Sequence, residues 1–260
     1  MDGPLAAIVR ALLDPGDTTE RLEAVTTGMS GASVVRVMRD GVPDRFVKIA
    51  DADAAAALRD EVTRTNWLAA RNIQVPRILR TREESGHFAA LMEAVPGRPA
   101  DANALPVPQL VEALAGTLVT LHALPSGDCP FDETLSVRLA RAAEAVDAGD
   151  IEIAEFDVRN RDVAPEMLLA RLIAQQPAED IVVVHGDATL SNIMVDERGT
   201  AGFIDCGRAG RGDRYLDLGV LEADIAAHYG AEAAAHFARC YGVAWNTAKA
   251  LYYSDLYEFF

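Results

Sequence analysis

Short apolar runs separated by turn residues occupy the early part of the chain. Residues 34–38 and 46–49 are two such runs, and residues 40–43 between them include Asp, Gly and Pro. Because these residue types favour tight turns, the pattern predicts a β-hairpin. Residues 53–71 then combine an alanine run with leucine, valine and tryptophan, which predicts a helix capped by Asp53.

Two more apolar runs, 78–82 and 88–92, predict a second pair of strands after that helix. The sequence V-P-G-R-P at residues 95–99 breaks the pattern, and the periodicity beyond it becomes mostly helical. We therefore expect two lobes, an N-terminal lobe over residues 1–94 and a C-terminal lobe over residues 95–260.

Helical periodicity dominates the second lobe, and three short apolar runs that predict strands interrupt it. The fold class expected from this order is α+β, with an antiparallel sheet and one main helix first and a mostly helical lobe second. Asp213 and Asp217 are expected as caps or loop anchors of the helix that follows them. The predicted helices are 108–123, 132–148, 165–175 and residues 215 onward, and the predicted strands are 181–184, 193–195 and 202–204.

An excess of acidic residues favours cationic binding partners over anionic ones. The 260 residues include 40 Asp and Glu against 24 Lys and Arg, which gives a formal net charge of -16. Such a chain repels phosphate backbones and anionic lipid, so nucleic-acid and membrane partners are not expected, whereas cationic small molecules are attracted. Two of the basic residues are lysines, Lys48 and Lys249, and a lysine within an apolar run is well suited to bind phosphate oxygens.

The cysteines and the N-terminus indicate a reducing compartment. Cys129, Cys206 and Cys240 form no C-x-x-C pair, which predicts neither a disulfide framework nor a zinc site. The first residues carry Asp2 and no basic cluster, unlike a secretory signal, and no apolar run is long enough to span a membrane. We expect a cytoplasmic protein that is a monomer or a weak dimer.

The stretch from residue 182 to residue 208 carries polar residues at the ends of apolar strands. Asn192 follows Asp187 by five positions, and Asp205 follows Asp187 by eighteen. The pattern H-x-D-x-x-x-x-N followed by D-x-G matches the catalytic set of protein kinases, with Gly186 in place of their Arg and Cys206 in place of their Phe. Carboxylate and amide oxygens bind magnesium, and a second carboxylate can accept the proton of an attacking hydroxyl, so these residues predict phosphoryl transfer.

Together with other segments, this stretch resembles the aminoglycoside phosphotransferases, and most closely the 3′-phosphotransferases that inactivate kanamycin and neomycin. The resemblance covers nearly the whole chain, and it implies a bilobal protein-kinase-like fold with ATP bound between the lobes. The other segments that carry it are Leu121-His122, residues 128–131 (DCPF), residues 208–214 (RAGRGDR) and residues 257–260 (YEFF).

The resemblance implies a role for each residue of the nucleotide site. Asp187 would be the catalytic aspartate, and Asn192 and Asp205 would hold magnesium. Lys48 would pair with the α- and β-phosphates of ATP, with GTP as an open alternative, and Glu61 would hold Lys48 in place. The alternative for Lys48 is an edge-strand lysine whose ammonium extends to solvent, and the alternative for Glu61 is a solvated glutamate on the helix surface.

Two loops complete the implied nucleotide site. Residues 28–33 would form the nucleotide-positioning loop, which departs from the kinase pattern G-x-G-x-x-G. The hydroxyl of Ser30 and backbone N–H groups such as that of Gly31 would therefore have to contact the phosphates. Residues 92–95 would form the hinge, where the carbonyl of Glu93 and the N–H of Val95 face adenine.

A cationic acceptor requires an acidic binding surface. The resemblance assigns this role to Asp157, Glu155, Glu258 and the terminal carboxylate of Phe260, and a solvated acidic face is the alternative for each of them. The sequence departs from the family at Tyr257, where many members have Asp, and this leaves the range of aminoglycosides open.

The function that we expect is ATP-dependent phosphorylation of the 3′-hydroxyl of 2-deoxystreptamine aminoglycosides such as kanamycin and neomycin, which confers antibiotic resistance. One alternative is a kinase of the same fold with another acceptor, either the streptomycin 3″-hydroxyl or a cationic metabolite. Another is a nucleotide-binding regulator that does not catalyse, and the intact catalytic set argues against it.

Overall fold

The structure, a computed structural model, describes residues 4–13, 21–25, 32–39 and 41–260. Packing divides the chain into two units, Met1–Pro96 with Phe203–Gly207, and Gly97–Gly202 with Arg208–Phe260. The first unit therefore includes a short segment, Phe203–Gly207, that comes more than a hundred residues later in the chain. The predicted division, with one boundary at residue 94, assigns this segment to the second lobe.

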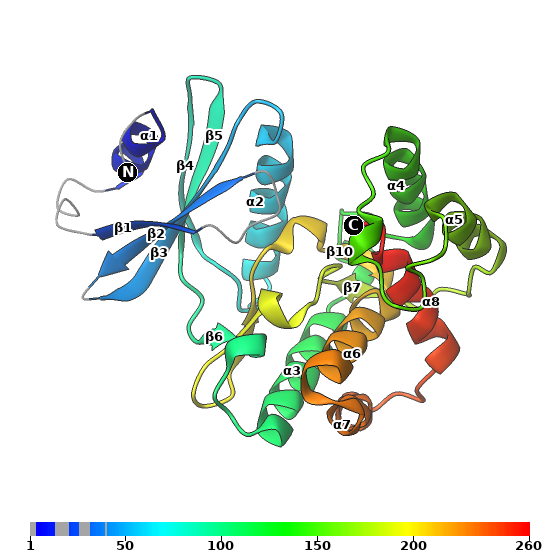
Figure 1. The fold of residues 1–260 in the computed structure, drawn as a ribbon. Helices are drawn as coiled ribbons and strands as arrows, with labels where there is room; N and C mark the ends of the chain where they lie inside the picture. The colour runs from blue at the N-terminus through cyan, green and yellow to red at the C-terminus, as the bar shows by residue number, and fades with distance from the viewer. Residues whose placement is uncertain (1–3, 14–20, 26–31, 40) are drawn as a thin grey trace. The chain divides into compact units, whose positions relative to one another are not determined.

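The first unit is built on a five-stranded antiparallel sheet with the strand order β1-β2-β3-β5-β4 (Figure 1). Both predicted hairpins are present, β2–β3 and β4–β5. Ser85 and Gly86 in the second hairpin have φ values of 52° and 80°, as a tight turn between antiparallel strands requires. The elements are α1 (Pro4–Leu12), β1 (Arg21–Val25), β2 (Ser33–Arg39), β3 (Val42–Ala50), α2 (Ala55–Ala69), β4 (Ile78–Glu84) and β5 (His87–Glu93).

Alternation along the strands divides the apolar side chains between the two faces of this sheet. Val47 and Ile49 pack in a cluster with residues of α1, whereas Phe88 and Met92 pack in a cluster with residues of α2. Lys48 lies between Val47 and Ile49 in β3, so its side chain projects from the opposite face to theirs. The two-residue period of the strand therefore directs Lys48 toward α2.

The start of the first unit differs from the sequence prediction. The apolar pattern does not predict α1 and β1, because both are short and β1 is an edge strand with partly exposed residues. The prediction that Asp53 caps α2 is wrong. No described side chain caps the first N–H groups of α2, and Oδ1 of Asp51 instead accepts the N–H groups of Asp53 and Ala54, each at 3.2 Å, in the turn that leads into the helix.

The described part of the second unit holds the helices α3 to α8 and two small sheets (Figure 1). The helix α6 packs against α7 and α8, and α3 packs against α7. Strand β7 pairs with β10, and β8 lies between β6 and β9. The elements are β6 (Arg98–Pro99), α3 (Val107–His122), α4 (Leu135–Ala148), α5 (Pro165–Ala174), β7 (Ile181–Val184), β8 (Ile193–Val195), β9 (Ala201–Phe203), β10 (Gly210–Asp213), α6 (Tyr215–Tyr229), α7 (Ala231–Tyr241) and α8 (Thr247–Tyr257).

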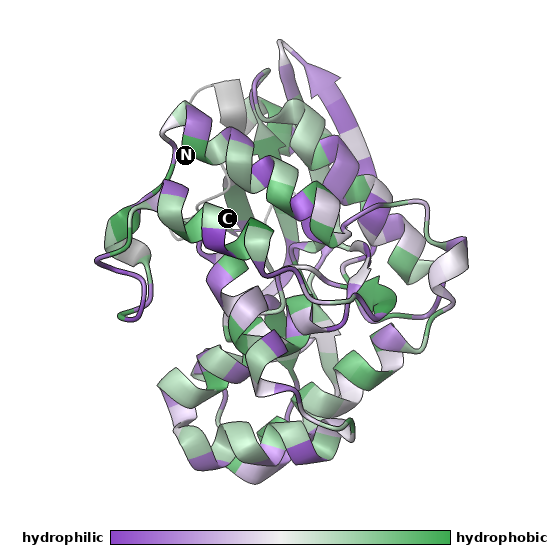
Figure 2. Cartoon of the chain, turned by 90° about the vertical axis from the view of Figure 1, so that its right-hand side faces the viewer, coloured by the Kyte–Doolittle hydropathy of each residue, from purple (hydrophilic) through white to green (hydrophobic). Residues whose placement is uncertain are grey.

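All the helices and strands predicted for the second lobe are present, and the predicted α+β class is confirmed. The pattern does not predict β6 and β10, because β6 is two residues long and includes a proline, and β10 contains two glycines. Figure 2 shows helices that carry both hydrophobic and hydrophilic residues, as expected when one face of a helix is buried and the other is exposed. None of the helices in the described ranges has both the length and the apolar character needed to cross a bilayer.

Candidate active site

Lys48 forms the centre of an ionic cluster in the first unit. Its ammonium Nζ donates to Oε1 of Glu61 at 2.6 Å and also to Oδ1 of Asp205. The Lys48 side chain is only 10% exposed. Burial acts to lower the pKa of Lys48, but the charges of Glu61 and Asp205 together outweigh it and raise the pKa above its ordinary value. The lysine is therefore a permanent cation held between two carboxylates.

Each carboxylate of this cluster reaches Lys48 from a different element. Glu61 lies on α2, where Leu58 and Val62 pack onto the sheet and bring the helix close to β3. Asp205 follows β9, and the backbone N–H of Phe203 donates to the carbonyl of Gln74 at 2.8 Å, which attaches this segment to the first unit.

The backbone at Asp205 is strained. Its φ of 58° lies in the left-handed region, which a residue with a Cβ adopts only where the surroundings impose it. Its side chain is 45% exposed although one oxygen contacts Lys48. The next residue, Cys206, is fully buried, and burial followed by the charge of Glu61 raises the pKa of its thiol. Asp205 is thus presented toward solvent, and Cys206 packs as an unreactive thiol.

Asp187 is the centre of a second polar cluster, in the second unit. It follows β7, and its carboxylate accepts hydrogen bonds on both oxygens. Nδ2 of Asn192 donates to Oδ2 at 3.0 Å and to the backbone carbonyl of Asp187 at 3.0 Å. The hydroxyl of Tyr257 donates to Oδ1 at 2.5 Å, and Nη1 of Arg208 lies 3.9 Å from the same oxygen.

The buried carboxylate of Asp217 fixes the backbone that carries Asp187. It accepts the N–H of His185 at 2.8 Å and the N–H of Gly186 at 2.7 Å, and it pairs with Nε2 of His122 at 3.0 Å. Burial acts to raise the pKa of Asp217, but the hydrogen bond and charge of His122 outweigh it and hold the pKa below its ordinary value. Asp217 lies within α6 and anchors the loop before Asp187, whereas Asp213 accepts the N–H of Tyr215 at the start of that helix.

Gly186 is required by the same loop. Its φ is +78°, and a Cβ there would lie 2.3 Å from the carbonyl oxygen of Arg208 and 2.4 Å from Nη2 of Arg138. That Arg138 nitrogen donates to the carbonyl of Gly186 at 2.8 Å. The position therefore needs a residue without a side chain.

The residues expected to bind the acceptor cluster around the end of α8. Glu258 accepts the backbone N–H of Asp157 on both oxygens, at 3.0 and 3.1 Å, and burial raises the pKa of Glu258. Oδ1 of Asp157 accepts the N–H and the Nε of Arg159, both at 2.9 Å. The Phe260 ring lies 4.9 Å from the guanidinium of Arg138. Glu258 therefore supports the loop that carries Asp157.

Of the remaining predicted site residues, the structure describes Glu93 and Val95. The side chain of Glu155 and residues Ser30 and Gly31 lie outside the described part of the chain. The Glu93 carboxylate pairs with Arg77, with Nε at 2.8 Å from Oε2. Val95 is buried, and no backbone hydrogen bond engages its N–H within the described ranges.

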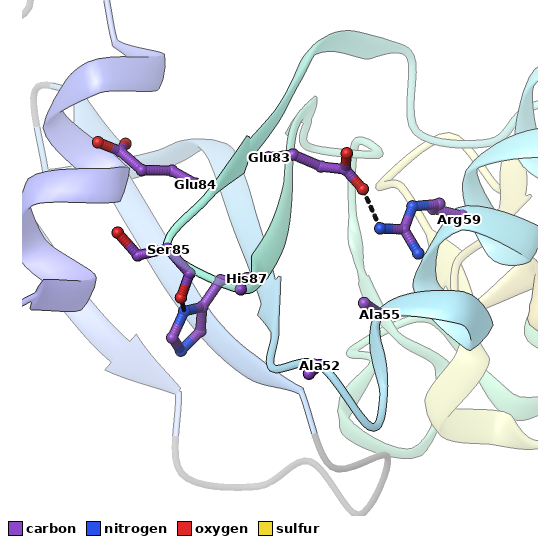
Figure 3. Close-up of a pocket in the computed structure, with 8 residues that line it drawn as sticks. Ala52, Ala55, Arg59, Glu83, Glu84, Ser85 and His87 are labelled. Atoms are coloured by element: carbon purple, nitrogen blue, oxygen red, sulfur yellow. Dashed lines mark hydrogen bonds and ion pairs between the residues drawn. The ribbon is translucent and has the colours of Figure 1, made fainter.

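A separate hollow lies on the first unit, between the start of α2 and the β4–β5 turn (Figure 3). Arg59 and Glu83 form an ion pair beside it, and Nδ1 of His87 lies 3.1 Å from the carbonyl of Ser85. None of the predicted site residues in the described part of the first unit lines this hollow, so it is separate from the Lys48 cluster. Its lining residues are Ala52, Ala55, Arg59, Glu83, Glu84, Ser85, Gly86 and His87.

Asp217, Arg138 and Tyr257 are the site residues whose contacts the sequence motifs do not reveal. Tyr257 lies 70 positions from Asp187 in sequence, and Asp217 lies 31 positions from Gly186. A short motif records spacing within one loop, so it contains no information about partners from other helices. The segment of residues 257–260 (YEFF), which contributes to the family resemblance, is the sequence signal that points to this region.

The fold and the two clusters define a phosphotransferase with a protein-kinase-like fold. One unit pairs a strand lysine with a helix glutamate, and the other presents an aspartate beside an asparagine. The sequence profile of the phosphotransferase enzyme family matches residues 22–251. The chain belongs to this family and, within it, to the aminoglycoside phosphotransferases.

Relatives of two acceptor types show comparable similarity. Streptomycin 3″-kinase of Streptomyces griseus is 35% identical, and the aminoglycoside 3′-phosphotransferase of Niallia circulans is 33% identical, each match covering 90% of both chains. Among solved structures, an aminoglycoside phosphotransferase from Streptomyces rimosus has a TM-score of 0.86 at 33% identity, covering 98% of this chain and 97% of its own. An aminoglycoside-3′-phosphotransferase of type VIII has a TM-score of 0.84 at 37% identity, with 98% of both chains covered.

Proposed function

We propose that this protein transfers the γ-phosphoryl group of ATP to the 3′-hydroxyl of 2-deoxystreptamine aminoglycosides such as kanamycin and neomycin. The observation that carries the transferase chemistry is the Asp187 carboxylate, which two neighbouring donors orient on a backbone anchored by Asp217. The similarity to aminoglycoside phosphotransferases over nine-tenths of the chain supports the acceptor class. Resistance to the antibiotic is the biological role that follows.

The Lys48 cluster would bind the nucleotide. A permanent ammonium buried beside β3 is suited to the α- and β-phosphates, and Glu61 keeps it in place when phosphate oxygens replace the contact to Asp205. The carbonyl of Glu93 and the N–H of Val95 would face adenine, and Ser30 and Gly31 would contact phosphate. ATP is the proposed donor, and GTP is an alternative with the same phosphates.

The oxygens of Asp205 and Asn192 suit magnesium. Asp205 offers a half-exposed carboxylate, and the Asn192 amide gives its nitrogen to Asp187, so its oxygen is the atom left for a cation. Magnesium prefers such hard oxygen ligands. When bound, the ion would neutralise charge on the transferred phosphoryl group.

Asp187 would orient the acceptor hydroxyl and accept its proton. A bond forms between the acceptor oxygen and the γ-phosphorus, the bond from that phosphorus to the bridging oxygen of ADP breaks, and the hydroxyl proton passes to Oδ1 or Oδ2 of Asp187. Orientation and charge stabilisation supply most of the rate in such transfers.

Cationic acceptors fit the charge of the chain. A net charge of -16 favours binding of polycations over anions, and Asp157, Glu258 and Phe260 would contribute near the acceptor. Streptomycin is the second candidate acceptor, because the match to a streptomycin 3″-kinase is as extensive as the match to 3′-enzymes. A cytoplasmic monomer or weak dimer is sufficient for either reaction.

Release of ADP tests the proposal directly. Purified protein with ATP and magnesium is offered kanamycin, a 3′-deoxy analogue of kanamycin, and streptomycin. We expect turnover of kanamycin and none of the 3′-deoxy analogue. Turnover of streptomycin alone would replace the proposed acceptor with the second candidate, and no turnover of any of them would favour a non-catalytic nucleotide-binding protein.

Replacing Asp187 tests its role in the same assay. We expect Asp187→Ala to abolish turnover while the affinity for ATP stays close to that of the wild type, because the Lys48 cluster is unchanged. Near-normal turnover of this variant would refute the assigned role.

A further inference from the structure

Residues 257–260, at and just after the end of α8, contact the Asp187 loop, the segment around residues 156–157, α4 and Arg208 through four consecutive side chains. Each of the four has its own partner within the second unit, so residues 257–260 are packed against the rest of that unit. The contacts are Tyr257 with Asp187, Glu258 with the N–H of Asp157, Phe259 with Phe156 at 6.2 Å between ring centroids, and Phe260 with Arg138 and Arg208 at 4.9 and 5.1 Å.

The bond from Tyr257 to Asp187 is the shortest hydrogen bond at this carboxylate. The two oxygen atoms are 2.5 Å apart, which is typical of a hydroxyl bound to a charged carboxylate. Asn192 donates to the other oxygen of Asp187 at 3.0 Å. Because the two donors bind different oxygens, together they fix the rotation of the carboxylate about its Cβ–Cγ bond.

We propose that Tyr257 is a positioning residue for phosphoryl transfer, whose hydroxyl sets the plane of the Asp187 carboxylate and thereby the direction from which the acceptor hydroxyl must approach. Each carboxylate oxygen can accept two hydrogen bonds. With Tyr257 on Oδ1 and Asn192 on Oδ2, each oxygen keeps one position for the acceptor. This inference rests on the proposed function, since it assigns a role within that reaction.

The surroundings keep the Tyr257 hydroxyl as a donor. Burial and then the charge of Asp187 raise the pKa of Tyr257 above its ordinary value, so the phenol stays protonated at neutral pH. Arg208, 3.9 Å from the same Asp187 oxygen, is too far away to replace the hydroxyl as a hydrogen-bond donor. Loss of the hydroxyl would therefore leave Oδ1 without a donor at bonding distance in the described second unit.

Two Tyr→Phe substitutions in the same helix separate positioning from packing. Tyr257→Phe removes the hydroxyl on Asp187. Tyr253→Phe is the matched control, because the Tyr253 hydroxyl is buried in α8 with no hydrogen-bond partner among the described residues. We expect Tyr257→Phe to lower kcat about tenfold, the size expected for one hydrogen bond to a charged group, with the KM for ATP unchanged. Tyr253→Phe should keep the wild-type kcat.

The inference is overturned if kcat of Tyr257→Phe equals or exceeds that of the wild type, or if Tyr253→Phe loses as much. A second readout does not use activity. The free energies of unfolding of Tyr257→Phe, Asp187→Asn and the double variant should be non-additive, because the two groups interact directly. Additive values would also overturn it.

Failure of the proposed function can be distinguished from failure of this inference. If the wild type phosphorylates no aminoglycoside, the proposed function is refuted, and the same variants are compared in the slow hydrolysis of ATP, where water is the acceptor. Tyr257→Phe should again be slower than both the wild type and Tyr253→Phe, and equal rates would overturn the positioning role.

Discussion

Lys48 illustrates how a single residue acquires its properties from its neighbours. Burial alone would favour the neutral amine, but Glu61 and Asp205 raise the pKa of the lysine above its ordinary value. The stability that this pair of contacts contributes is therefore fully present below the ordinary lysine pKa and is lost only as pH rises through the higher folded-state value. At neutral pH the ammonium is fully charged.

Glu61→Gln should weaken the hold on this ammonium without changing the shape of the side chain. We expect kcat/KM for ATP to fall about tenfold, because the amide of Gln can still accept a hydrogen bond from Lys48 but leaves Asp205 as its one charged partner in this cluster. The control is Glu83→Gln, which removes an exposed carboxylate paired with Arg59. Such surface ion pairs contribute little, so this control should behave as the wild type. Equal effects of the two variants would contradict the special role of Glu61.

Asp217 should make the stability of the protein depend on pH at acidic values. Its pKa is held below the ordinary value of 3.8, so its contribution is present above that value and is lost as pH falls through the folded-state pKa. Asp217→Asn should cost about 3 kcal/mol at pH 7, because buried donors would lose a charged acceptor. Urea unfolding at pH 7 and pH 3.5 should show this difference shrinking at the lower pH, and a constant difference would contradict the assignment.

At the scale of elements, the sequence pattern predicts helices, strands and contacts between residues that are close in sequence. The strands and helices with clear periodicity are where the pattern places them, and Asp187 and Asn192 meet because one short loop holds both. The short strands β6 and β10 have too few residues to show a period. The partners supplied by α6 and α8 depend on tertiary packing, which the spacing within a motif does not record.

Gly186→Ala tests whether the loop before Asp187 depends on this packing. Gly199 is the matched control, since its φ of +81° is similar but a Cβ there meets nothing within 4 Å. Gly199→Ala should cost about 1 kcal/mol through backbone strain alone and keep its activity. Gly186→Ala must also displace the Arg208 backbone, so we expect a larger loss of stability and at least a hundredfold lower kcat. Equal Tm values for the two variants would show that the close approach is unimportant.

At the scale of the whole molecule, charge is the dominant property. The net charge of -16 attracts a polycationic acceptor and repels ATP. Adding salt from 0.05 to 0.5 M should therefore raise the KM for the aminoglycoside several-fold, because screening weakens the attraction. The KM for ATP should not rise in parallel. Steady-state kinetics at both salt concentrations checks this, and a KM for the acceptor that is independent of salt would contradict electrostatic binding.

The segment Phe203–Gly207 has a consequence for how the protein is made. The first unit needs it, since it supplies Asp205 to Lys48 and a backbone bond to Gln74. A ribosome must therefore synthesise more than a hundred further residues after Pro96 before the sheet that was translated first can acquire its last contacts. During that interval, the nascent chain carries Lys48 with one of its two counterions missing.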